Sequence, residues 1–130
     1  MVLSIWLLLN GVVYLILGFM FVFQFETMAG SLGIEVLSGS AAIELITVYG
    51  GLETGLGVLF IMALFVMKYR LFSLQILTFS YLCFAMGRLA GMLGHDVAST
   101  MTYYLLVFEI VGFVVSALLL KKGVVHHEEG

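Results

Sequence analysis

One stretch of the chain reads LFSLQILTFSYLCFAMGRLAGML, from Leu71 to Leu93, and contains a single charged side chain, Arg88. A helix needs roughly 20 predominantly apolar residues to cross the hydrocarbon core of a membrane, which is about 30 Å thick. The stretch meets that length and lacks the strict alternation of a transmembrane β-strand. It therefore predicts a membrane-spanning helix with a charge inside it.

Three further runs have the same length and character. The amino-terminal run lacks the basic start and the small-residue cleavage site of a secretory signal, so we expect it to remain as a helix. Glycines interrupt helical periodicity over residues 26–40, which we expect to form a loop. The predicted fold is all-α, with one transmembrane domain over residues 1–130. Its helices are Val2–Phe25, Ala41–Met67, Leu71–Leu93 and Met101–Leu120, followed by a polar tail over residues 121–130.

The composition excludes several classes of protein. The chain has 130 residues, is 63% hydrophobic and 10% charged, and contains no proline, which is too apolar for a soluble globule. A net charge of −3 with only five Lys and Arg argues against binding to the phosphate backbone of nucleic acid. A single cysteine, Cys83, rules out an intramolecular disulfide and a Cys-x-x-Cys pair.

Basic residues predict the orientation. Short loops rich in Lys and Arg stay in the cytoplasm. All four basic residues outside the predicted spans belong to one side, so both termini should be cytoplasmic, as in a bacterial inner membrane protein. Short connections also favour an up-down-up-down four-helix bundle. The basic residues are Lys68, Arg70, Lys121 and Lys122, whereas residues 26–40 and 94–100 contain none.

Three charged side chains fall at similar depths in three different spans. At 1.5 Å of rise per residue, Glu44 lies about 6 Å from the outer end of its helix, Arg88 about 8 Å and Glu109 about 12 Å. A charge at the bilayer centre costs roughly 2.5–3.5 kcal/mol unless it is compensated. Each charge also shares a helical stripe with small or polar residues. We therefore predict a wet, outer-half network centred on Arg88, with His95 and Asp96 just beyond it.

Other interpretations of these residues remain open. Arg88 could extend toward the membrane surface, form a structural ion pair that fixes helix order, or bind a ligand. His95 and Asp96 fit a loop cap better than a metal site, because a metal would require further ligands. The sequence thus predicts neither a metal nor a cofactor.

Glu53 lies near the middle of its span and about half a turn away from Glu44. It cannot face the same cavity as Glu44 unless the helix twists or unwinds. Asn10 lies at a comparable depth and could pair with it. The other interpretations are a neutral carboxyl, which removal from water favours, or a contact between subunits.

Small residues at a spacing of four or seven allow helices to approach closely. We expect such glycines to serve packing rather than ligand binding. They are Gly51 and Gly55, Gly87 and Gly91, and Gly11 and Gly18.

A set of motifs spread along the chain carries a resemblance to a known family. They are Asn10-Gly11, Glu44, Tyr49-Gly50-Gly51-Leu52, Gly55-Leu56-Gly57, Gly87-Arg88-Leu89, Asp96 and Glu109. This pattern resembles the bacterial family labelled domain of unknown function 4345, which consists of small four-helix membrane proteins. The resemblance implies that Tyr49 belongs with the charged positions, but not Glu53. The chain departs from the family at two places. Ile46-Thr47 stand where the family often has a basic residue, and Val97 follows Asp96 where the family often has a glycine.

Two functions fit these observations best. The first is binding or transport of a small molecule, lipid or proton at the outer charged pocket, which requires accessible charges. The second is an accessory role in a membrane complex, with a membrane protein or a second copy docked on outward-facing glycines. An enzyme fits less well, because no Ser-His-Asp or Cys-His set shares a face and no cofactor motif occurs.

Overall fold

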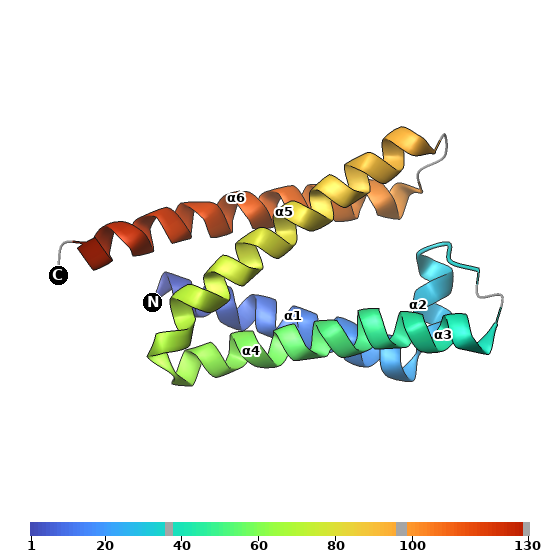
Figure 1. Cartoon of the computed structure of the whole chain (residues 1–130), viewed down its shortest axis with the longest axis horizontal. Helices are drawn as coiled ribbons and strands as arrows, with labels where there is room; N and C mark the ends of the chain where they lie inside the picture. The colour runs from blue at the N-terminus through green and yellow to red at the C-terminus, as the bar shows by residue number, and fades with distance from the viewer. Residues whose placement is uncertain (36–37, 96–98, 129–130) are drawn as a thin grey trace. The chain divides into compact units, whose positions relative to one another are not determined.

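The computed structural model describes residues 1–35, 38–95 and 99–128, with side chains as far as Lys122. Within these residues the fold is all-α, as predicted (Figure 1). Four helical stretches are long and apolar enough to cross a membrane, and they match the four predicted spans. The chain forms two compact units, Met1–Arg70 and Leu71–Gly130. The single four-helix bundle stays a prediction.

In the first unit, α1 (Val2–Phe23) lies against η1 (Ile46–Leu52) and α4 (Glu53–Phe65). α1 and the second span are antiparallel. Tyr14 packs edge-on against Phe60, whereas Phe21, later in α1, stacks on Tyr49, which precedes Phe60 in the second span. α3 (Gly39–Leu45) precedes η1, and the Ser38 side chain caps it by accepting from the N–H of Ala41 at 3.2 Å. The span is thus continuous from Gly39 to Phe65.

Glycines set the distance between α1 and α4. A Cβ on Gly18 would lie 2.7 Å from the backbone nitrogen of Thr54 and 2.9 Å from the carbonyl oxygen of Gly50. A Cβ on Gly57 would lie 2.9 Å from the backbone nitrogen of Leu15, and one on Gly11 would meet Ile61. Only a residue without a side chain fits at such separations. Gly11 and Gly18 therefore lie where α1 closely approaches the second span.

The second span meets α1 through glycines other than Gly51 and Gly55. A Cβ on Gly51 or Gly55 would meet nothing within 4 Å, whereas Gly50 and Gly57 form the contact with α1. The spacing of Gly51 and Gly55 shows that they share a face, but it does not show that a neighbouring helix covers that face. A Cβ on Gly87 or on Gly91, in the second unit, would also meet open space.

The first helix ends two residues earlier than predicted, at a sharp break. Gln24 has φ −129° and ψ 41°, and α2 (Phe25–Ser31) begins directly after it. Part of the predicted loop is therefore helical. α2 ends in a Schellman motif, in which Gly33 has φ 71° and its N–H bonds to the carbonyl of Gly30, while that of Ile34 reaches Ala29.

A π-helix interrupts the second span. η1 covers seven residues, from Ile46 to Leu52, and contains Tyr49-Gly50-Gly51. In a π-helix the carbonyl of residue i accepts from the N–H of residue i+5, so the turn contains one residue more than in an α-helix. One extra residue in a regular α-helix would rotate the rest of that helix by about 100°. The contacts on either side of η1 nevertheless follow the phase expected from the sequence. Gly51 and Gly55, on the side of Glu44, are exposed, whereas Gly57, on the side of Glu53, packs against α1.

Arg70 ends the first unit by capping α4. After Phe65 the chain passes through Val66 and the 3₁₀ turn η2 (Met67–Tyr69). The Arg70 side chain then turns back, and its Nε donates to the carbonyl of Ala63 at 3.1 Å while Nη2 donates to that of Leu64 at 2.9 Å. A cation at the C-terminus of a helix satisfies carbonyls that have no intrahelical donor.

The second unit consists of α5 (Arg70–Gly94, mostly within it) and α6 (Thr100–Glu128). The Tyr81 ring packs edge-on against Phe108, with centroids 5.8 Å apart, and lies so close to Gly112 that a Cβ there would be 2.6 Å from it. α6 extends through most of the predicted polar tail, so the predicted end of the helix at Leu120 was wrong.

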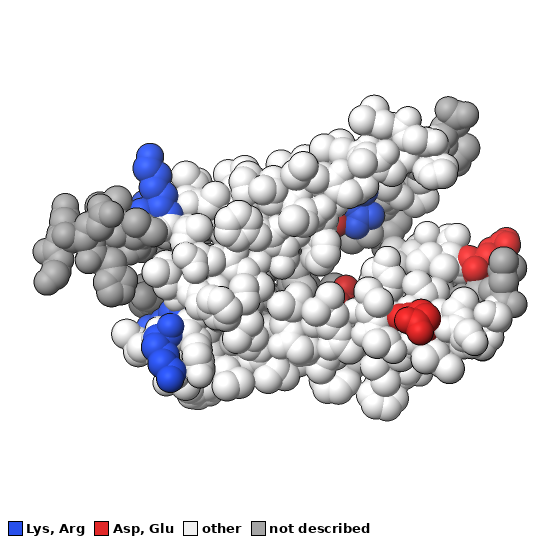
Figure 2. All heavy atoms as spheres, in the orientation of Figure 1, with Lys and Arg blue, Asp and Glu red and all other residues white. Residues whose placement is uncertain are grey.

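The visible surface is almost entirely free of charged side chains, which gather at a few places (Figure 2).

The packing of α1 on α4 predicts opposite effects for two glycines. Gly18→Ala should lower the free energy of unfolding by about 1–3 kcal/mol, because its methyl group would overlap the backbone of the second span. Gly55→Ala is the matched control: it adds the same methyl group to open space and should leave stability unchanged or raise it by up to about 1 kcal/mol. Thermal unfolding in one detergent compares them, and equal melting temperatures would contradict the close contact.

The cap on α4 predicts a specific role for one of the two loop cations. Arg70→Gln should destabilise the protein by about 1.5–3 kcal/mol, since it removes charge-assisted bonds to two carbonyls. Lys68→Gln removes the same charge two residues earlier, without touching those carbonyls, and should cost little. Chemical unfolding of both variants measures the difference. A loss of equal size in both would assign the effect to charge alone.

Candidate functional site

Arg88 and Glu109 form an ion pair between α5 and α6. The Nε of Arg88 donates to both carboxylate oxygens of Glu109, at 3.1 Å to Oε1 and 2.9 Å to Oε2. Its Nη2 donates to Oε1 at 2.5 Å. The planar guanidinium thus engages the carboxylate through two nitrogens, which is the strong, geometrically specific form of this interaction. Two of the charged residues singled out in the sequence therefore meet.

The two partners differ in exposure. The Glu109 side chain is 7% exposed, whereas that of Arg88 is 26% exposed. Arg88 therefore turns its fork toward the carboxylate of the neighbouring helix and does not simply extend away from the protein. The guanidinium is therefore the more exposed of the two partners.

Small and aromatic residues shape the surroundings of the pair. Glu109 shares its buried stripe on α6 with Gly112 and Ser116, as helical phase predicted. Gly112 leaves room for the buried ring of Tyr81, which lies seven residues before Arg88 on the same face of α5. The accommodation of the Tyr81 ring by Gly112 is seen only in the structure.

The remaining predicted site residues lie in separate parts of the chain. Glu44 is an exposed residue of α3 in the first unit, so its share in an Arg88 network stays a prediction. Tyr49 lies in η1 and stacks on Phe21 with ring centroids 4.9 Å apart. His95 is exposed directly after α5. Asp96 lies outside the described residues, so the His95-Asp96 loop cap also stays a prediction.

Glu53 is the first residue of α4, directly after the π-helix. Its Oε2 atom is buried and has no hydrogen-bond partner among the described residues. Asn10, which the sequence offered as a partner, donates from Nδ2 to the carbonyl of Trp6 in its own helix at 2.8 Å. The pairing of Asn10 with Glu53 stays a prediction.

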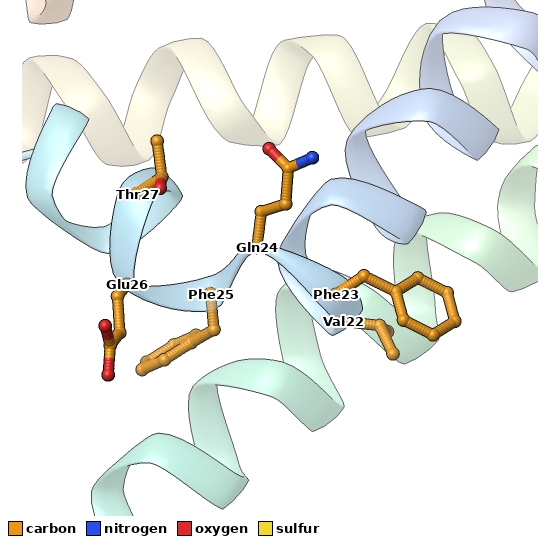
Figure 3. A pocket seen from close by; sticks show the side chains of 6 residues that line it. All are labelled: Val22, Phe23, Gln24, Phe25, Glu26 and Thr27. Carbon is orange, nitrogen blue, oxygen red and sulfur yellow. The ribbon is translucent and has the colours of Figure 1, made fainter.

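A hollow of about 470 Å³ lies at the junction of α1 and α2 (Figure 3). Gln24 and Thr27 point to one side of the junction, while Phe25 and Glu26 point to the other. Six consecutive residues line the hollow, from Val22 to Thr27. It therefore results from the helix break at Gln24, and its lining does not bring separate elements together.

The buried position of Glu109 predicts strong coupling within the ion pair. Arg88→Gln should destabilise the protein by roughly 3 kcal/mol, because it leaves a buried carboxylate without its cation. The double variant Arg88→Gln/Glu109→Gln should recover most of this loss, since two amides replace two charges. Unfolding of the two single variants and the double variant measures the coupling. Additive losses would mean that the two side chains act independently.

Comparisons with known proteins place the chain in a family. No curated protein and no solved structure matches it. One family, described as domain of unknown function (DUF4345), matches residues 2–120, which is nearly the whole chain. The match covers all four apolar helices and both members of the ion pair. The chain belongs to the DUF4345 family.

Proposed function

We propose that this protein is a multi-pass protein of a bacterial inner membrane, arranged as an up-down-up-down bundle with both termini in the cytoplasm. Four helices of sufficient length and apolarity support the membrane location. The positions of Lys68, Arg70, Lys121 and Lys122 support the orientation, since two follow the second span and two follow the fourth.

Within that membrane we propose a binding or transport role for a small molecule, lipid or proton at the Arg88–Glu109 pair. The observation that supports this role most directly is that the Arg88 side chain is 26% exposed while its guanidinium binds the buried carboxylate of Glu109. The exposed part of a guanidinium is a planar cation, which attracts anionic groups. Of the ligands considered, the geometry therefore favours an anionic small molecule or a lipid headgroup. Glu109 would hold the cation in place between binding events.

An accessory role in a membrane complex is the second candidate. Gly51 and Gly55 are exposed, and a Cβ on either would meet nothing within 4 Å. This open face of the second span is what helix docking through small residues requires. In that case the Arg88–Glu109 pair would fix the two helices of its unit without taking a ligand.

Native mass spectrometry of the full chain, extracted gently with its lipids, tests the binding role. The wild type should carry a defined adduct whose mass distinguishes a lipid from a free small molecule. Arg88→Gln should lose this adduct, whereas Lys121→Gln, which removes the same charge outside the predicted spans, should keep it.

The double variant Arg88→Gln/Glu109→Gln separates binding from folding. It is expected to recover stability yet still lack the adduct, because the cation that recognises the ligand is gone. If the adduct persists in the folded double variant, or never appears in the wild type, the pair is structural. The search would then turn to protein partners of the Gly51–Gly55 face.

A further inference from the structure

Glu53 occupies a position in the first unit where a carboxyl group is unfavourable. The span runs from Gly39 to Phe65, and Glu53 lies near its middle. Its Oε2 atom is buried, and no donor among the described residues bonds to it. The residue as a whole is half-buried. An apolar setting disfavours the charged form of a carboxyl that has no compensating cation.

The elements packed near Glu53 supply no such cation. α1 contains no charged residue, and its titratable side chain, Tyr14, packs against Phe60. α3 contributes Glu44, which is exposed and of like charge. The titratable side chain of η1, Tyr49, stacks on Phe21. η2 carries Tyr69 and Lys68, and Lys68 lies about 20 Å from Glu53 along the helix at 1.5 Å per residue.

The local backbone does not compensate for Glu53 either. The carbonyl of Gly50 already accepts a hydrogen bond from Oγ1 of Thr54 at 2.7 Å and one from the N–H of Glu53. Thr54 therefore directs its hydroxyl to the backbone instead of to the carboxyl. Two other glutamates of the predicted spans differ, since Glu109 pairs with a guanidinium in its own unit and Glu44 is exposed.

We propose that Glu53 is a proton-binding site, a carboxylic acid that is neutral within its span and takes up or releases a proton when that region opens to water. The π-helix supports this role, because such widened turns are frequent at functional positions and η1 ends where Glu53 begins. The proposal does not rest on the binding role proposed for Arg88 and Glu109, because the observations behind it all come from the first unit.

Infrared spectroscopy of the full chain in lipid vesicles tests this proposal directly. The carbonyl stretch of a protonated carboxylic acid should be present in the wild type near neutral pH and absent from Glu53→Gln. Strongly alkaline buffer should remove the same band from the wild type. Glu44→Gln and Glu109→Gln are matched controls, and both should retain it.

Labelling with dicyclohexylcarbodiimide gives a second readout. This reagent adds across a protonated carboxyl, so the product keeps all atoms of both reactants and the adduct can be located by peptide mass. Glu53 should be labelled at least tenfold more than Glu109, and labelling should fall as the pH rises. An infrared spectrum without a band difference between the wild type and Glu53→Gln would overturn the proposal, whatever the fate of the Arg88 adduct.

Discussion

The structure depends on one constraint: polar groups within long apolar helices need partners inside the protein. The backbone meets it by forming helices, and several side chains meet it by bonding to backbone carbonyls of their own helix. Thr47, Thr54 and Thr78 each donate to the carbonyl four residues earlier. Arg88 and Glu109 are a case in which two helices cooperate, because the guanidinium on α5 meets the carboxylate on α6.

The length and apolarity of the helices also bear on how they pack. Lipid tails are as apolar as leucine, so burial alone gives little reason for two membrane helices to associate. Close backbone contact at Gly18 and Gly50 replaces that driving force with van der Waals attraction along α1 and α4. In the other unit Gly112, three residues after Glu109 on α6, leaves room for the ring of Tyr81.

Much of this arrangement could be predicted from the sequence, because length and apolarity determine a membrane span almost alone. Arg88 and Glu109 could be matched because α5 and α6 are regular helices, across which depth and phase can be counted. Counting failed at the break at Gln24, where the first helix ends earlier than its apolar run. The break and the π-turn of η1 both depend on backbone dihedrals that hydrophobic periodicity does not reveal.

What the sequence could not decide about Glu53 is whether its carboxyl has a partner. Spacing places Glu53 about half a turn from Glu44, on the side of Gly57, which packs against α1. Whether a donor reaches the carboxyl there depends on side-chain rotamers, which hydrophobic periodicity does not reveal. Thr54, the hydroxyl next to it in the chain, donates to the carbonyl of Gly50 at 2.7 Å, and Oε2 of Glu53 has no hydrogen-bond partner among the described residues. Glu53 is therefore an exception to the constraint that the paired side chains obey, and this exception is what makes it the candidate for proton binding.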